Sequence, residues 1–203
     1  MQDFQPSPPP HGSNTWKWVA IGCGGCLGLS VLGLVSLGII FSRALNLSVD
    51  SETVEQEAQA LFEYEIPEGS QGMLTMNIFG IEMIQVTDTH EPHRVLLTMG
   101  RIPPLFQEEN ARGAFMEGLQ ESLAEDEGYR FRSLSTKSLS LCDQTVDVII
   151  ETGTLERSGE NLPAVSYLTS VNYQGSERFA WILANGNQAA EKAQTVLASL
   201  ECR

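Results

Sequence analysis

The longest hydrophobic stretch of the chain lies near its beginning, where no charged residue occurs from Trp18 to Ser42. Lys17 and Arg43 bracket this stretch. A helix of that length measures roughly 37 Å at about 1.5 Å per residue, whereas the hydrocarbon core of a bilayer is about 30 Å thick. The pattern therefore predicts one transmembrane helix over residues 17–42.

The flanks of this stretch favour a retained anchor over a cleaved secretory signal. A signal has a shorter apolar core, roughly 7 to 15 residues, which small residues follow at the cleavage site. Here the core is longer, and Trp16, Trp18 and Phe41 lie where an aromatic belt is expected. Cleavage near Ala44 is the alternative. Lipidation of Cys23 is disfavoured, because almost all of the apolar core follows that residue.

Two glycines within the predicted span, Gly24 and Gly28, have the spacing that lets two membrane helices approach closely. They predict weak homodimerisation through the helix, although glycine is common in membrane spans. Cys23 and Cys26 lie among the same glycines, where they are interpreted as small packing residues and not as a redox or metal site.

After residue 50, helical and strand patterns alternate. Apolar residues at i, i+4 and i+7 predict helices that begin at Asp50 or Ser51, at Pro103-Pro104 and at Asn187. Period-two patterns predict strands in the regions 74–78, 83–86, 94–99, 130–141, 145–154, 164–173 and 178–184. Consecutive strands with short connections form antiparallel sheets. The expected fold class is α+β, an antiparallel sheet with helices packed on its faces, preceded by one transmembrane helix.

This element order, the start Ile66-Pro67-Glu68-Gly69, the strand pair interrupted at Gly80 and the amphipathic closing helix resemble the PsbP/Mog1-like fold over about residues 50–202. That group includes photosystem accessory proteins, a nuclear-transport factor and bacterial membrane-anchored lipoproteins. The resemblance is one of architecture, without a catalytic motif that maps onto single residues. It implies a binding or assembly role and says nothing about the partner.

The chain is expected to divide into a disordered Pro-rich tail (1–16), the transmembrane helix (17–42), a linker (43–50) and one soluble α+β domain (51–203). Residues 44–203 contain 25 acidic and 10 basic side chains. A domain so acidic is repelled by phosphate backbones and anionic lipids, which excludes nucleic acid as a partner. The charge serves solubility, or else it attracts a basic partner or divalent cations.

The side of the membrane is set only weakly by charge, because one Lys or Arg stands on each side of the span. A short tail before an N-terminal anchor usually stays in the cytoplasm. We therefore expect a single-pass protein of the cell membrane with residues 44–203 extracytoplasmic. In an oxidising compartment Cys142 and Cys202 would form a disulfide, and two buried thiols are the alternative.

Candidate site chemistry concentrates in one polar loop, where Asp88, His90, Glu91 and His93 place two imidazoles and two carboxylates within six residues. Such groups are ligands for zinc or copper, but their spacing matches no strong metal motif, and a solvated turn is the favoured interpretation. No nucleophile motif or phosphate-binding loop occurs. We expect no cofactor, no resident metal and no enzymatic activity.

Two functions of different classes follow. The favoured one is a membrane-anchored, non-catalytic extracytoplasmic module that binds another protein or assists assembly of a complex. The alternative is a metal-handling or hydrolytic domain centred on His90 and His93.

Overall fold

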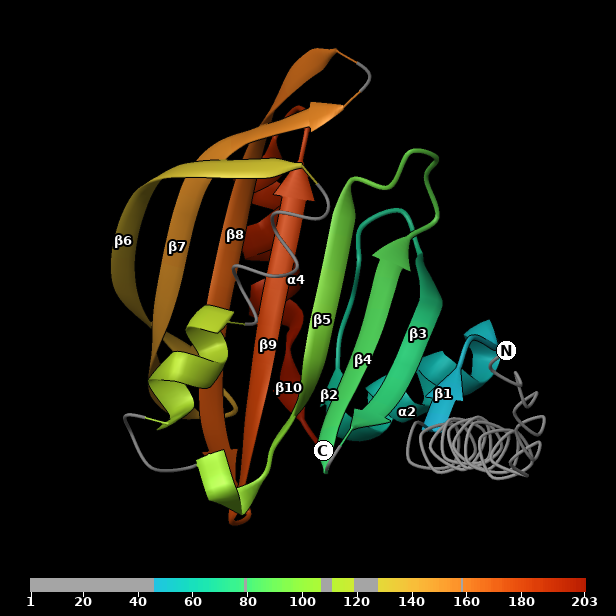
Figure 1. Ribbon diagram of the computed structural model, residues 1–203, viewed down its shortest axis with the longest axis vertical. Helices are drawn as coiled ribbons and strands as arrows, with labels where there is room; N and C mark the ends of the chain where they lie inside the picture. Colours follow the sequence, from blue (N-terminus) through green and yellow to red (C-terminus); the bar gives the residue numbers. More distant parts are fainter. Residues whose placement is uncertain (1–45, 79, 107–110, 119–127, 158) are drawn as a thin grey trace, which may run out of the picture. The chain divides into compact units, whose positions relative to one another are not determined.

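The computed structural model describes residues 46–78, 80–106, 111–118, 128–157 and 159–203. In this part of the chain one antiparallel sheet has the strand order β1-β3-β4-β5-β9-β8-β7-β6 (Figure 1). Its strands are β1 (Asn46–Ser48), β3 (Ser70–Ile78), β4 (Ile81–Asp88), β5 (Val95–Ile102), β6 (Tyr129–Leu141), β7 (Gln144–Arg157), β8 (Glu160–Tyr173) and β9 (Ser176–Asn185). A second, two-stranded sheet pairs β2 (Phe62–Glu63) with β10 (Glu201–Cys202).

Tight turns join most neighbouring strands, as the sequence predicts. Gly80 has a φ of 84° in the turn between β3 and β4. Cys142 and Asp143 both have positive φ between β6 and β7, and Gln174 and Gly175 do between β8 and β9. Two consecutive positive φ values match the right-handed twist of the flanking strands, and such turns favour two-residue hairpins. The order is not simply sequential, however, because β5 pairs with β9.

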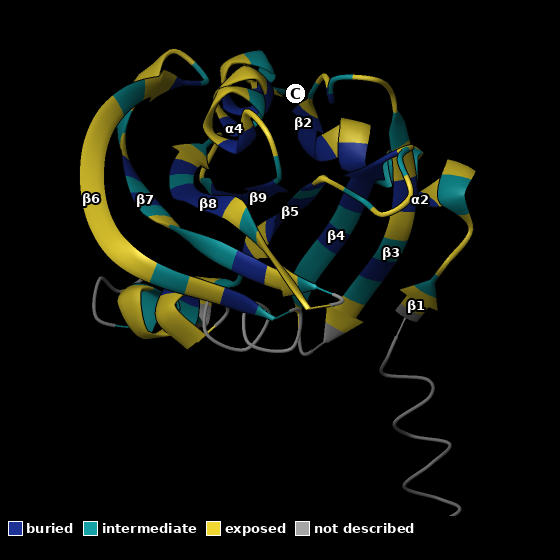
Figure 2. Cartoon of the chain, turned by 90° about the horizontal axis from the view of Figure 1, so that it is seen from above, coloured by how far each residue is buried: buried dark blue, intermediate teal, exposed yellow. Residues whose placement is uncertain are grey.

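Helices cover both faces of the sheet, which confirms the antiparallel α+β class (Figures 1 and 2). Helices α2 (Ser51–Leu61) and α4 (Ala189–Ser199) pack on one face, where the buried cluster includes Val54, Leu61, Val196 and Leu197. A helical segment over residues 111–118, which we call the 111–118 helix, lies against the other face, and its Met116 belongs to the second buried cluster.

Strand β9 lies between these two clusters and is buried on both sides. Phe179, Trp181 and Leu183 belong to the cluster that contains Met116, whereas Ala180 and Ile182 belong to the cluster that contains residues of α2 and α4. The period-two pattern predicts a strand over 178–184, but it does not predict that both faces of this strand are buried. A central strand that is covered on both faces has no polar alternation to reveal it.

The helix boundaries confirm one expectation and correct two. Asp50 caps α2, since its Oδ1 accepts a hydrogen bond from the Thr53 amide at 3.0 Å. At α4 the N-cap is Gln188, with a φ of 61° and no side-chain cap, so the assignment to Asn187 was wrong. After Pro103 the described chain forms a short 3-10 turn, η1 (Pro104–Phe106), and helix only over 111–118.

The predicted linker is also corrected. Asn46–Ser48 form β1, which pairs with β3 from Asn46 opposite Asn77 to Ser48 opposite Thr75. Three residues are too few to show a periodic pattern, so the sequence does not predict this strand. It forms because its backbone can hydrogen-bond to the edge of β3. The segment 17–42, for which the sequence predicts a transmembrane helix, and its Gly24 and Gly28 lie outside the described residues. Within the described ranges, no helix is long and apolar enough to cross a bilayer.

Candidate functional site

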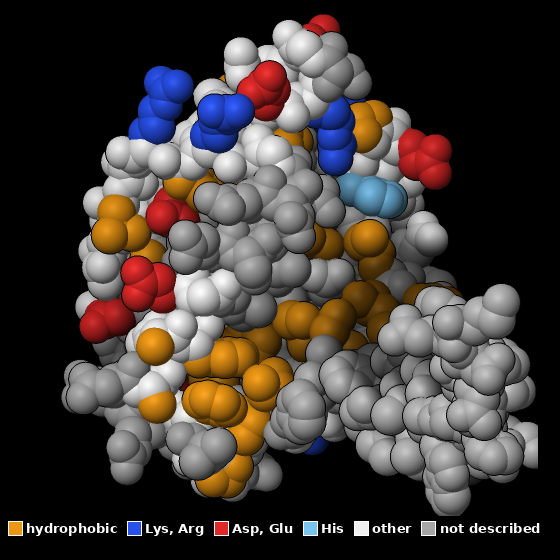
Figure 3. All heavy atoms as spheres, viewed as in Figure 1, with side chains coloured by type: hydrophobic (Ala, Val, Ile, Leu, Met, Phe, Trp, Pro, Cys, Tyr) orange, Lys and Arg blue, Asp and Glu red, His pale blue; other side chains and the backbone are white. Residues whose placement is uncertain are grey.

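A groove lies on the face of the sheet opposite α2 and α4. Its wall is the 111–118 helix, and its floor is formed by β6, β7 and β8. Its volume is about 580 Å³, which is in the range of sites that hold several side chains of a ligand or peptide. On this face, acidic and hydrophobic side chains lie next to each other over β6 and the 111–118 helix (Figure 3).

The floor of the groove is apolar. Each of the three strands contributes one side chain, namely Leu134 of β6, Ile149 of β7 and Leu168 of β8. Ile149 is directly opposite Leu168 of β8. On β6, Leu134 is opposite Glu151, the next residue of β7 on the same face as Ile149. Exposure rises outward across this row, from 1% at Leu168 to 69% at Leu134. The row thus extends the buried core into solvent at the edge of the sheet.

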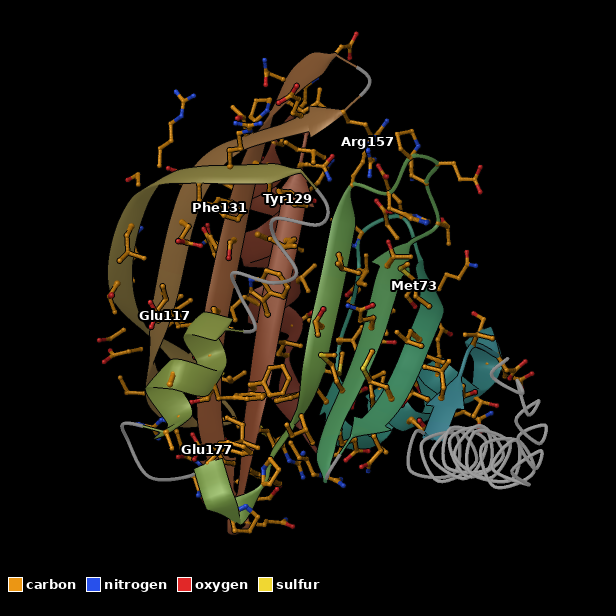
Figure 4. The ribbon with its side chains drawn as sticks, in the orientation of Figure 1. Met73, Glu117, Tyr129, Phe131, Arg157 and Glu177 are labelled. Carbon is orange, nitrogen blue, oxygen red and sulfur yellow. A yellow bond between two sulfur atoms is a disulfide. The ribbon has the colours of Figure 1, made fainter. Side chains whose placement is uncertain are left out.

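The rim is acidic. Asp147 and Glu151 flank Ile149 on β7, and Glu117, labelled in Figure 4, lines the same groove from the 111–118 helix. The Asp147 carboxylate accepts a hydrogen bond from the Ser138 hydroxyl at 2.9 Å, a contact between directly opposed residues of β6 and β7. Because alternate residues of a strand share a face, Asp147, Ile149 and Glu151 of β7 follow one another along the groove, with the apolar side chain between the two acids.

Arg112 is the only cation among the described residues that line the groove. Its Nη1 donates to Oε1 of Glu177 at 3.2 Å, and the same oxygen accepts from the Ser170 hydroxyl at 2.9 Å. Phe115 adds an edge-on contact with Phe179, with ring centroids 5.9 Å apart. An ion pair and an aromatic contact thereby hold the 111–118 helix on β9, and the guanidinium charge is already matched by Glu177.

The loop from Asp88 to His93 contains one carboxylate that is buried, although the sequence favours a solvated turn there. Asp88 is 2% exposed, and both of its carboxylate oxygens accept from the Arg94 amide at 3.1 Å. His93 Nδ1 lies 3.1 Å from the Asp88 carbonyl oxygen and 3.5 Å from its Oδ1. The carboxylate therefore closes its own loop through local hydrogen bonds.

The other members of this set point to different partners. His90 Nδ1 lies 3.0 Å from Oε2 of Glu68, and Glu91 precedes Pro92 through a cis peptide bond. Among the described residues no three histidine, cysteine, aspartate or glutamate side chains are grouped so that they could hold a metal ion. The structure thus does not bring Asp88, His90, Glu91 and His93 together as a ligand set.

A small cavity of about 50 Å³ lies beside this loop, and its lining includes Met73, His93, Tyr129, Arg157 and Asn185 (Figure 4). The Asn185 amide donates to the Tyr129 hydroxyl at 3.1 Å and to the His93 carbonyl at 3.2 Å. Arg157 also donates to that carbonyl. These bonds tie β5, β6, β7 and β9 together at one end of the sheet, and the cavity has room for little more than water.

Cys142 and Cys202 form a disulfide in the structure, with their Cα atoms 5.2 Å apart. The bond joins the turn between β6 and β7 to β10 at the end of the chain. Arg178 supports the same region from β9, because its guanidinium donates to the carbonyls of Leu61 and Arg203 and lies 4.9 Å from the Tyr173 ring centroid. Burial lowers the pKa of Arg178, and the nearby positive charge of Arg101 lowers it further.

The groove was not predicted from the sequence. The strand predicted over 145–154 places Asp147, Ile149 and Glu151 on one face, a mixed pattern that does not indicate whether this face is covered. The run Val148-Ile149-Ile150 was the available signal, because three successive apolar residues on a strand place apolar side chains on both faces. The helix that covers the second face comes from a distant part of the chain, so local patterning could not identify the groove.

Comparison with known proteins shows no matching family model and no matching curated protein. Among solved structures, the chain is similar to the crystal structure of LpqN, which is involved in cell envelope biogenesis of Mycobacterium tuberculosis. The match has 9% sequence identity and a TM-score of 0.37, and it covers 69% of this chain and 82% of that chain. This is a distant likeness at the level of the fold, and it carries no argument about function.

Proposed function

We propose that this chain is a membrane-tethered, non-catalytic binding or assembly module, which receives a segment of another protein in the groove between the 111–118 helix and β6, β7 and β8. The observation that carries this proposal is the solvent-exposed apolar row that leads out of the core to Leu134, bordered by acidic side chains. Apolar side chains that remain exposed in a groove with a polar rim are typical of protein-binding surfaces.

The composition of the groove supports binding over catalysis. The described lining residues include no histidine and no cysteine, and the hydroxyl of Ser170 bonds to Glu177. A nucleophile needs a base within hydrogen-bond reach and a third group that orients the base. The PsbP/Mog1-like resemblance, which implies a binding or assembly role, is part of this proposal.

The uncharged stretch from Trp18 to Ser42 supports a tether, and the Cys142–Cys202 disulfide supports an extracytoplasmic domain. Disulfides persist mainly in oxidising compartments. In this arrangement the anchor keeps the acidic domain beside the bilayer, where it meets other proteins of the membrane.

Site-specific photo-crosslinking in intact membranes tests the binding role. A photoreactive residue is placed at Leu134 or at Glu117, which line the groove from the strands and from the 111–118 helix, and at the exposed Gln194 of α4 as a control. Both groove positions are expected to yield one and the same adduct, identified by mass spectrometry, that the control does not. Equal labelling at all three positions, or no adduct from the groove, contradicts the proposal.

Alkaline carbonate extraction tests the tether separately. The full chain is expected to remain with the membranes, whereas a chain that begins at residue 44 is expected to wash off. Release of the intact chain, or a mature N-terminus near residue 45, would remove the tether from the proposal.

A further inference from the structure

Exposed apolar side chains gather at the β1 edge of the sheet. In the described part of the chain four large hydrophobic side chains are exposed, and three of them lie at this edge. Leu47 of β1 is 61% exposed, Val49 directly after β1 is 71% exposed, and Met73 of the neighbouring strand β3 is 40% exposed. Single exposed apolar residues are ordinary, but a group of them indicates a surface that meets an apolar partner.

The strand register continues this group into an apolar face. Leu47 is paired with Met76 of β3, and Met76 is paired with Met83 of β4, so these side chains form a row across the sheet. Leu74 and Ile81 share the face, because each lies two residues from a member of the row. Met83 packs against the second buried cluster. The row therefore extends that cluster outward to the β1 edge, and Figure 3 shows hydrophobic side chains over β4 and β5 on this face.

The helices that the structure describes leave this half of the face open (Figure 1). Helix α2 packs on the opposite face, where Val54 and Ile84 belong to one buried cluster. The 111–118 helix lies over β6, β7 and β8. The nearby charges are also on the α2 face, because Glu82 shares the face of Ile84 and pairs with Arg101, and α2 itself contains three acids and no basic residue. This edge is thus apolar on one face and acidic on the other.

The sequence connects this edge closely to the predicted anchor. The uncharged stretch ends at Ser42 and β1 begins at Asn46, so three residues separate them. Four residue steps span at most about 14 Å of extended chain. In the tethered arrangement proposed above, the β1 edge therefore lies near the lipid, whereas β6 is at the opposite end of the sheet.

We infer that the apolar face of β1, β3 and β4, which we call the β1–β3–β4 face, docks on the surface of the bilayer. Leu47 and Met76 then lie at the boundary between headgroups and acyl chains, and the acids of α2 remain in water. This inference rests on the tether of the proposed function and adds a fixed orientation of the domain. Zwitterionic lipid is the expected contact, since the acids of α2 are repelled by anionic headgroups.

Photolabelling of lipid tests the docking with the full chain in phosphatidylcholine nanodiscs that hold one chain each. A photoreactive residue is placed at Leu47 or Met76, and at the exposed Gln59 of α2 as a control on the opposite face of the same half. Lipid adducts, measured by mass spectrometry, are expected to be at least about fivefold more frequent at Leu47 and Met76 than at Gln59. Equal labelling of the two faces overturns the inference.

A longer connection separates docking from simple proximity. Ten Gly and Ser residues inserted after Arg43 extend the reach of the domain by roughly 17 Å. If the face itself binds lipid, lipid labelling at Met76 is expected to fall less than about twofold in this extended chain. A fall to the level seen at Gln59 would mean that the short connection alone caused the contact, and it overturns the inference.

Paired variants of the extended chain locate the contact. Leu47→Ser with Val49→Ser removes two exposed apolar side chains and is expected to lower lipid labelling at Met76 at least about threefold. The matched pair Gln56→Ser with Gln59→Ser changes two exposed residues of α2 and is expected to leave this labelling unchanged. Thermal unfolding shows that both variants are folded. Equal effects of the two pairs contradict a contact through the β1–β3–β4 face.

The docking and the proposed function fail separately. Absent lipid labelling of the β1–β3–β4 face in a chain that resists carbonate extraction overturns the docking and leaves the tether and the groove as proposed. Adducts to a second chain in place of lipid, in nanodiscs that hold two chains, would identify a homodimer surface and also overturn it. Release of the intact chain by carbonate would instead remove the tether itself.

Discussion

Arg112 Nη1 lies 3.2 Å from Glu177 Oε1, and this ion pair joins the 111–118 helix to the central strand β9. The two side chains differ in exposure, 37% for Arg112 and 8% for Glu177. A buried carboxylate that loses its cation remains desolvated without compensation. Removing the cation of a buried ion pair therefore lowers the free energy of unfolding more than removing the cation of a surface pair. The ion pair thus sets the position of one wall of the groove.

Replacing Arg112 should destabilise the protein and loosen the 111–118 helix. Arg112→Gln is expected to lower the free energy of unfolding by about 1–3 kcal/mol, because the Glu177 carboxylate keeps only its Ser170 donor, and to speed amide exchange in residues 111–118. The matched control is Arg101→Gln, since Arg101 pairs with Glu82 at 2.9 Å with 44% and 27% exposure. That change should cost less than about 1 kcal/mol. Equal costs in the two variants would mean that Glu177 does not depend on Arg112.

The disulfide should account for a substantial part of the domain's stability. The two cysteines are 60 positions apart in sequence, and cross-links that close loops of this length stabilise by roughly 2–5 kcal/mol. Cys142→Ser with Cys202→Ser is expected to lose that amount in denaturant unfolding. Reduced wild-type protein serves as the comparison and should match the double variant. If only the double variant loses stability and the reduced wild-type protein does not, the introduced serines and not the missing disulfide cause the loss.

Gly153 should not tolerate a side chain. It lies on β7 opposite the irregularity of β6 between Phe131 and Ser133, and a Cβ there would overlap the carbonyl oxygen of Arg130. Gly153→Ala is therefore expected to destabilise by roughly 1–3 kcal/mol, because the two strands must move apart.

Gly113→Ala is the matched change at an open position of the 111–118 helix. It is expected to stabilise by about 0.5–1 kcal/mol, since alanine loses less backbone entropy than glycine in a helix. Thermal or denaturant unfolding of both variants measures the contrast, and a destabilising effect at Gly113 would contradict the open packing there.

Alkaline pH should weaken the fold through Tyr64. Burial, with the negative charge of Glu55 as the second cause, raises the pKa of its phenol to about 12, although the Ser70 hydroxyl lowers it somewhat. An unfolded tyrosine titrates near about 10. The folded state therefore favours the neutral phenol, whose contribution is complete below about pH 10 and is lost as the pH rises toward 12.

The corresponding variant is Tyr64→Phe, which cannot ionise. Its free energy of unfolding is expected to fall less steeply than that of the wild type from about pH 10 upward. Some decline should persist, because burial also raises the pKa of Tyr167. Denaturant unfolding at several pH values measures both slopes, and identical slopes would show that Tyr64 ionises freely in the folded protein.

Local patterns predicted local structure well. Asp50 was identified as a helix cap because a residue with a short side-chain acceptor precedes an amphipathic run. Its carboxylate accepts hydrogen bonds from the Thr53 hydroxyl and from the Thr53 amide, and these lower the pKa of Asp50. The interruption at Gly80 and the short connections after the strands 130–141 and 164–173 were likewise predicted, and residues with positive φ occupy these turns in the structure. The disulfide between Cys142 and Cys202 was predicted because these are the two cysteines that follow the apolar stretch.

Other features depend on neighbours that are distant in sequence. The pairing of β5 with β9 brings residues 95–102 beside residues 177–184, and no local periodicity encodes that choice. Strand β1 and the Gln188 cap also escaped prediction, because each is held by the rest of the fold and not by its own residues.

By itself, the sequence determined the uncharged stretch, the acidic balance and the alternating order of helices and strands, because hydrophobic period and charge are properties of adjacent residues. Only the tertiary structure decided that the 111–118 helix lies across β6, β7 and β8, and that Ile149 lies between two acids on the floor of a groove. The reason is physical. Which sheet face stays open depends on long-range packing, and a row of side chains drawn from three strands exists only once their register is set.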